Sequence, residues 1–65
     1  MNNAYVERAL EVIDERNILC NLASKRASEI SRGSKPLVDV PLGTVALDIA
    51  LLEIAEGKVT YELSE

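Results

Sequence analysis

The side chains that could carry chemistry in this chain are carboxylates, a few bases and one thiol. Histidine is absent and Cys20 is the single cysteine. The thiol therefore has no imidazole to activate it, an intrachain disulfide is impossible, and a zinc site of the usual Cys/His kind is excluded. Acid–base chemistry would depend on carboxylates or lysines, but the acidic residues of the helical segments follow the spacing of solvated faces: Glu7, Glu11, Asp48, Glu53 and Glu56. The pattern predicts no catalytic residue, cofactor or metal, and it favours Cys20 as a small buried side chain.

Charge limits the kinds of partner. Eleven acidic residues against seven basic ones give a net charge of −4, which disfavours nucleic acid because its binding relies on clustered Lys and Arg. The first ten residues include Glu7 and Arg8 and no apolar export signal. The apolar run 45–55 is too short and too acidic to span a bilayer. Together with the free thiol, these features favour a cytoplasmic protein.

The core available to this chain is light. Apolar residues make up 48% of the 65 residues, yet Trp and Phe are absent and only Tyr5 and Tyr61 are aromatic. A chain of this length forms at most one small domain, so we expect a single domain over 1–65. Domains of this size normally need a disulfide, a metal or a partner to be robust. A partner or self-association is therefore the expected source of stability.

The segment 44–57 (TVALDIALLEIAEG) is the longest apolar run, and the other elements must be arranged around it. Its Leu, Ala and Glu residues favour a helix, with Thr44 placed to cap the start and Gly57 to take a left-handed conformation after the end. At about 100° per residue, its apolar side chains form two ridges on roughly opposite sides. The first ridge contains Leu47, Ala50, Leu51 and Ile54, and the second contains Val45, Ile49 and Leu52.

Two apolar ridges on one helix can be covered in two ways. We expect the first ridge to face the chain's own core through Leu47, Leu51 and Ile54. So short a chain has little material to wrap the second ridge, which favours a partner-binding surface at Val45, Ile49 and Leu52. Spacing shows that the ridges are opposite but not which one is inward, so the reverse assignment stays open. The other alternative is that the remaining segments of the chain wrap both ridges.

Two amphipathic helices are predicted before this segment. The first covers 4–14 with Asn3 as its cap, and the second runs from 18 to 31 or 32 with Asn17 as its cap, ending at Gly33. Their apolar faces predict further core residues: Leu10, Ile13, Leu19, Ala23 and Ile30.

Arg26 projects into the apolar face of the second helix, between Leu19 and Ile30. Its stem can cover apolar surface while the guanidinium reaches water. Alternatively, the guanidinium forms a charge-assisted pair with a carboxylate of the chain or of a partner. Arg26 is therefore a candidate partner-binding residue, with both alternatives open.

The segments outside the helices are predicted to be extended. Pro36 and Pro41 bracket the apolar segment 37–40 and push the residues before them towards extended conformations. We expect a connector laid over the core rather than a paired strand, with Leu37 available to a partner. Residues 58–63 alternate as a half-buried strand would, and an extended C-terminal arm fits equally well. The predicted fold class is all-α, a small bundle of about three helices with an extended Pro-bracketed connector and a short C-terminal arm.

Three blocks of the chain carry recognisable motifs: 15–27 (ERNILCNLASKRA), 35–38 (KPLV) and 50–59 (ALLEIAEGKV). Taken together, they resemble the omega subunit family of bacterial RNA polymerase. Residues 15–27 (ERNILCNLASKRA) are similar to a family helix with an apolar start, then Ala and a basic pair followed by Ala. Residues 35–38 (KPLV) look like the family's Pro-Leu-Val connector. Residues 50–59 (ALLEIAEGKV) match its Ala-Leu-x-Glu-Ile-x-x-Gly signature helix. Each block is short, but their order and spacing are fairly specific, and with the N-terminal helix they cover nearly the whole chain.

The resemblance implies a mostly helical, nonenzymatic accessory subunit. Such a subunit binds the largest polymerase subunit, beta-prime, and helps it fold and join the core enzyme, without direct contact to nucleic acid. In some relatives an N-terminal Met-Ala-Arg helps to bind guanosine tetraphosphate, whereas this chain starts with residues 1–4 (MNNA), which lack that arginine. Leu52 stands where many relatives have Arg, which makes the second ridge more apolar. The chain also ends soon after the signature helix.

Two other classes of protein remain open. A small dimeric regulator of the antitoxin type would build a helix–turn–helix from residues 4–32 and place Arg26 and Arg32 on DNA, although the net charge of −4 argues against it. A homo-oligomeric helical protein would instead pack the ridge of Val45, Ile49 and Leu52 against itself.

Overall fold

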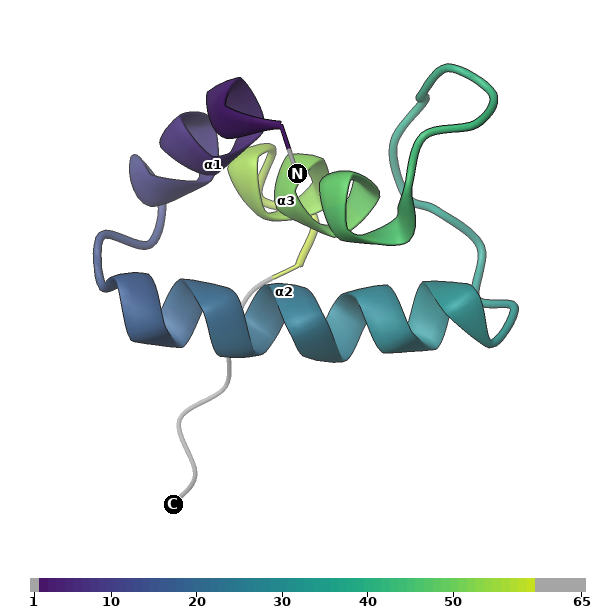
Figure 1. The fold of residues 1–65 in the computed structure, drawn as a ribbon. Helices are drawn as coiled ribbons and strands as arrows, with labels where there is room; N and C mark the ends of the chain where they lie inside the picture. The colour runs from purple at the N-terminus through teal and green to yellow at the C-terminus, as the bar shows by residue number, and fades with distance from the viewer. Residues whose placement is uncertain (1, 60–65) are drawn as a thin grey trace.

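The computed structural model describes residues 2–59, which form three α-helices and, within that range, no strand (Figure 1). Helix α1 spans Asn3–Leu10, α2 spans Arg16–Ser31 and α3 spans Ala46–Ala55. The predicted all-α class with about three helices is confirmed. A long connector without helix joins α2 to α3, and most of the predicted C-terminal arm lies outside the described residues.

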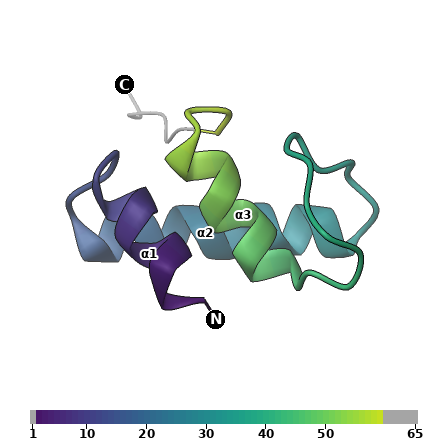
Figure 2. The same ribbon diagram turned by 90° about the horizontal axis from the view of Figure 1, so that it is seen from above.

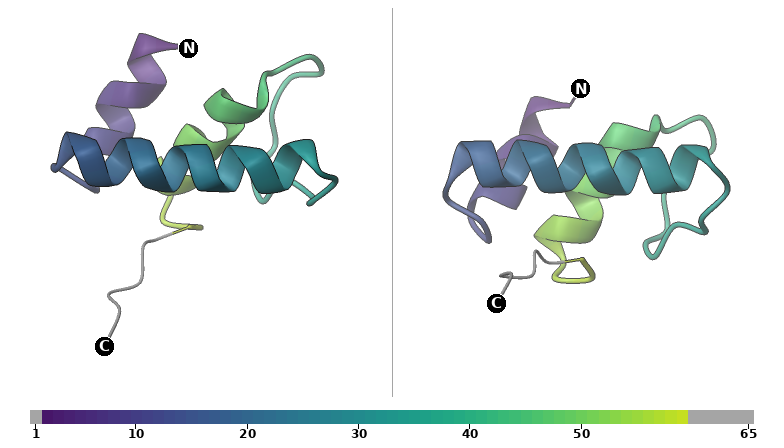
Figure 3. Two further views of the ribbon diagram at one scale, coloured as in Figure 1. Left: turned by 60° about the horizontal axis from the view of Figure 1, so that its bottom comes forward. Right: turned by 90° about the horizontal axis from the view of Figure 1, so that it is seen from below.

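Helix α3 is the central element of the bundle. Seen from above, α1 and α3 lie beside each other across the longer α2 (Figure 2), and in the views from below α2 lies in front and crosses both (Figure 3). Helix α3 packs extensively on α1 and on α2, whereas α1 and α2 contact each other much less. The most apolar segment of the chain therefore holds the other two helices together.

Side chains close to the predicted caps accept hydrogen bonds at the starts of α1 and α2. The Asn2 side chain accepts a hydrogen bond from the N–H of Ala4 at 2.9 Å, so Asn2 rather than Asn3 caps α1. The Glu15 carboxylate accepts from the N–H of Asn17 at 3.1 Å, which makes Glu15 the cap of α2 and places Asn17 inside the helix. The predicted caps were wrong by one and two residues, because adjacent Asn and Glu side chains can all accept from free N–H groups at a helix start.

Helix α3 begins without a side-chain cap. Its N-cap residue is Val45, and the Thr44 hydroxyl donates to the carbonyl oxygen of Pro41 at 2.6 Å. The prediction that Thr44 caps α3 was therefore wrong, since this hydroxyl closes a turn of the connector instead. Asp48 lies in the first turn, where a negative charge favours the helix dipole, and its carboxylate accepts from the N–H of Asn2 at 2.9 Å.

Glycines end α2 and α3 by the same hydrogen-bonding motif. Gly33 has a φ of +113° and Gly57 a φ of +74°, which are left-handed conformations that glycine adopts without steric cost. In both places the residue that follows the glycine donates its N–H to the carbonyl oxygen of the residue five positions before it, at 3.0 and 2.8 Å. This is the Schellman motif. The predicted end at Gly33 and the left-handed conformation of Gly57 are confirmed.

Helix α1 is shorter than its apolar pattern predicts. It ends at Leu10 rather than Asp14, and the N–H of Ile13 donates to the carbonyl of Ala9 at 2.9 Å. The turn that follows the helix carries Ile13 into the core, where it is 6% exposed. The early end of this helix therefore goes together with the burial of Ile13.

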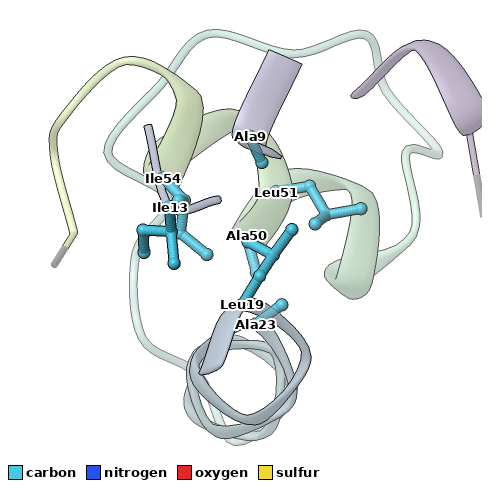
Figure 4. Packing of buried hydrophobic residues seen from close by; sticks show 7 residues of the cluster. All are labelled: Ala9, Ile13, Leu19, Ala23, Ala50, Leu51 and Ile54. Carbon is cyan, nitrogen blue, oxygen red and sulfur yellow. The ribbon is translucent and has the colours of Figure 1, made fainter. Parts of the chain in front are cut away.

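The core lies where the three helices meet (Figure 4). Its buried members come from all three helices and the turn after α1: Ala9, Ile13, Leu19, Ala23, Ala50, Leu51 and Ile54. Leu10 and Leu47 are half-buried against this cluster, and Ile30, near the end of α2, is also half-buried. Alanines at the centre allow the helix backbones to approach closely.

Candidate partner-docking site

Glu53 is a fully buried carboxylate in α3, with 0% of its surface exposed. The sequence pattern placed it on a solvated face, and that expectation was wrong. Helical spacing assigns Glu53 to one side of α3, but α2 and the connector cover that side. Each buried side-chain nitrogen and oxygen within residues 2–59 has a hydrogen-bond partner, including those of Glu53.

Arg26 of α2 is the main partner of Glu53. Its Nε donates to Glu53 Oε1 at 2.5 Å, and its Nη2 donates to Oε2 at 3.2 Å, which gives a two-point pairing. The Arg26 side chain is only 12% exposed. The guanidinium therefore forms a charge-assisted pair inside the chain, one of the two alternatives left open by the sequence, and it does not extend into solvent.

The same two side chains hold the connector. The N–H of Leu37 donates to Glu53 Oε2 at 2.7 Å, and Arg26 Nη2 donates to the carbonyl oxygen of Lys35 at 3.1 Å. Arg26 Nη1 also donates to Glu29 on the outer side of α2 at 3.1 Å. We call Arg26, Glu53 and the backbone of Lys35 and Leu37 the clamp. It ties α2, the connector and α3 together at one point.

The electrostatics of the clamp keep Arg26 charged. Its hydrogen bond to Glu53 raises the pKa of Arg26, burial acts in the opposite direction, and Glu29 adds to the increase. A folded-state pKa above the unfolded value contributes stability that is present at all pH values below the unfolded pKa and lost only as the pH rises through the folded one. The arginine side of the clamp is therefore insensitive to pH in the neutral range.

A buried ion pair contributes little net stability, because both charges lose their hydration. Removing one partner is costly, however, since the other charge stays buried without compensation. The directional hydrogen bonds that the pair forms with the backbone of Lys35 and Leu37 are thus a more important contribution of the clamp than its net stability. They fix where the connector begins relative to α2 and α3.

The connector carries exposed apolar side chains. Three of the four large apolar residues that are exposed within residues 2–59 lie between positions 37 and 45. Leu37 is 52% exposed, Val45 is 55% exposed and Leu42 is fully exposed. We call these three residues the connector face. Pattern analysis missed Leu42, because a leucine in a turn between Pro41 and Gly43 belongs to no helical or strand periodicity.

The other residues predicted to bind a partner occupy different environments. Ile49 and Leu52 are each 7% exposed, so the chain itself covers most of the second ridge and leaves only Val45 accessible at its start. This is the arrangement that the sequence offered as the alternative for that ridge. Their part in partner binding, like that of Arg26, stays a prediction.

Cys20 is exposed on α2, and the prediction that it is buried was wrong. Leu19 and Ala23 take the inward positions of this part of the helix, and Cys20 is rotated by about 100° from Leu19. Within residues 2–59, no group of three or more His, Cys, Asp or Glu side chains could hold a metal ion. None of the helices in this range has the length and apolar character needed to cross a membrane.

Comparison with known proteins relates the chain to RNA polymerase subunits. The model of the RNA polymerase Rpb6 family matches residues 8–61. The DNA-directed RNA polymerase subunit omega of Geobacter metallireducens is 42% identical over 64 residues, covering 98% of this chain and 93% of that protein. The chain belongs to the omega and Rpb6 family of RNA polymerase subunits. Omega subunits of Trichlorobacter lovleyi, 42% identical over 64 residues, and Clostridium botulinum, 40% identical over 62 residues with 95% of this chain and 85% of that protein covered, are similarly related. No solved structure matches the chain significantly.

Family membership gives the clamp a further meaning. The three blocks that resemble omega subunits are 15–27, 35–38 and 50–59, and each contributes one part of the clamp. Arg26 comes from the first block, the backbone of Lys35 and Leu37 from the second, and Glu53 from the third. Segments far apart in the sequence of this omega-family chain thus meet in a single hydrogen-bonded cluster.

Proposed function

We propose that the chain is a nonenzymatic accessory subunit of RNA polymerase that binds the largest subunit, beta-prime, in the cytoplasm. In this proposal it promotes the folding of beta-prime and its assembly into the core enzyme. The observation that carries the proposal is the 40–42% identity to omega subunits over nearly the whole chain.

The connector face is the surface that this function would use. Leu37, Leu42 and Val45 expose apolar area on a segment held by the clamp at one end and by α3 at the other. A docking segment that is already ordered loses less conformational entropy on binding, which favours affinity. Arg26 then acts by positioning the connector. Ile49 and Leu52 act from within the chain, where they support the connector and Val45.

A binding titration tests the proposal. The labelled chain is mixed with core polymerase purified from cells that lack this subunit, and in parallel with beta-prime during refolding from denaturant. We expect a one-to-one complex and a higher yield of soluble beta-prime. No binding to either preparation would overturn the proposal. Sedimentation of the isolated chain and a salt titration against duplex DNA reveal the two competing functions, a homo-oligomer and a DNA-binding regulator.

A further inference from the structure

A cavity of about 100 Å³ lies between the three helices, away from the clamp. Its apolar walls are formed by Val6 of α1, Leu19 and Ala23 of α2, and Leu47 and Leu51 of α3. Leu51 and Glu53, two positions apart, project to roughly opposite sides of α3. The cavity and the clamp therefore lie on different sides of the central helix.

The volume of the cavity limits what can fill it. An apolar cavity of ~150 Å³ is large enough for benzene, which has six carbons. By the same ratio, about 100 Å³ holds about four carbon atoms. That is the size of a single leucine or isoleucine side chain, and it is too small for an aromatic ring.

The rim of the cavity adds a charge. Arg16, Cys20 and Ser24 border the cavity from α2 and recur every four residues, so they form one row along the helix. The ion pairs within residues 2–59 are those of Arg26, and none of them includes Arg16. A cation next to an apolar cavity the size of one side chain favours a binding partner that brings an aliphatic side chain and a carboxylate close together.

We propose that this cavity receives one leucine or isoleucine side chain from a segment of the large polymerase subunit, with a neighbouring carboxylate of that segment paired to Arg16. The inference rests on the proposed function and adds a second contact to it, on the other side of α3 from the connector face. The occupant is identified by its chemistry: an extended or helical segment in which an aliphatic residue lies next to Asp, Glu or a chain end.

Cys20 provides a native reporter for this site. The thiol is exposed and borders the cavity, so N-ethylmaleimide should modify it readily in the isolated chain. In the complex with core polymerase the bound segment covers the thiol. We expect its rate of modification to fall at least tenfold.

Two substitutions with matched controls test the site by affinity for core polymerase. Arg16→Glu removes the cation, and an acidic residue in the first turn of α2 favours the helix dipole, so the fold is kept. Cys20→Leu fills the cavity from its rim with a side chain of the size that the cavity holds. We expect each to weaken binding at least tenfold. Lys25→Glu and Asn21→Leu alter exposed positions of the same helix outside the cavity, and they should change affinity less than twofold.

The outcomes separate this inference from the proposed function. If the chain binds core polymerase but all four variants bind equally and Cys20 reacts as fast as in the free chain, the cavity is empty in the complex and the inference is overturned, while the proposed function stands. If Cys20 is already protected in the dilute isolated chain, the cavity is covered before polymerase binds, which also overturns the inference. If the wild-type chain does not bind at all, both proposals fail.

Discussion

The two sides of α3 are stabilised in different ways. On one side, Leu51 and Ile54 pack into the cluster shared with α1 and α2 and retain at most 3% exposure. On the other side, the carboxylate of Glu53 is equally inaccessible but is held by hydrogen bonds from Arg26 and the connector. One helix thus carries a hydrophobic interface and a buried ionic one.

The two sides of α3 have different roles: one stabilises the fold, and the other positions the connector face. Apolar burial is non-directional and supplies most of the free energy of folding in a small domain. A buried ion pair adds little net free energy, but its hydrogen bonds act only in one geometry. The apolar side of α3 therefore keeps the chain folded, and the clamp side determines where the connector face lies.

The largest effect is expected on the apolar side. Ile54→Ala should lower the free energy of unfolding by about 2–5 kcal/mol, because Ile54 is 0% exposed and the deletion leaves a cavity at the helix junction. Urea denaturation followed by circular dichroism measures the change. Val12→Ala is the control, since Val12 is 52% exposed and its truncation should cost no more than ~0.5 kcal/mol. Equal effects of the two substitutions would contradict the assignment of the core.

A somewhat smaller loss is expected when the clamp is broken on one side. Arg26→Met leaves the Glu53 carboxylate buried without a cation, which should cost about 3 kcal/mol. The same denaturation experiment measures it. Lys25→Met, at an exposed position of the same helix, should change stability by no more than ~0.5 kcal/mol. If Arg26→Met is as mild as the control, the pair does not govern this side of α3.

Removing both charges should restore stability, so that the position of the connector can be tested separately from the stability of the fold. The double variant Arg26→Met/Glu53→Leu should unfold with a free energy within ~1 kcal/mol of the wild type, since no buried charge remains. The Leu37 amide loses its acceptor, so its hydrogen exchange should accelerate, and affinity for core polymerase should fall about tenfold. Retained protection of this amide, or unchanged affinity, would show that the clamp does not order the connector for binding.

The smallest effect on stability is expected on the connector face. Leu42→Ser should change the free energy of unfolding by no more than ~0.5 kcal/mol, because Leu42 is fully exposed. The free energy of binding to core polymerase should become weaker by about 1–2 kcal/mol if Leu42 is an apolar anchor. Val12→Ser makes the same kind of change at an exposed residue outside the connector, and it should leave affinity unaltered. Equal affinity of the two variants would remove Leu42 from the proposed interface.

The sequence by itself determined the features that depend on neighbouring residues. Helical periodicity predicted three helices and an all-α class, and Gly33 and Gly57 predicted where two of them end, because a left-handed glycine at a helix end is a local property. Leu19, Leu51 and Ile54 were predicted as core residues, and all three are buried. Three short blocks were enough to indicate the omega family.

Only the tertiary structure decided which segment covers each face. Spacing placed Glu53 on the side of α3 away from Leu51, but it could not show that Arg26 and Leu37, 27 and 16 residues away in sequence, surround it. The coverage of Ile49 and the exposure of Cys20 have the same origin. Periodicity fixes the direction of a side chain relative to its own helix axis, whereas burial and charge pairing depend on residues distant in the chain, which only the packed fold brings together.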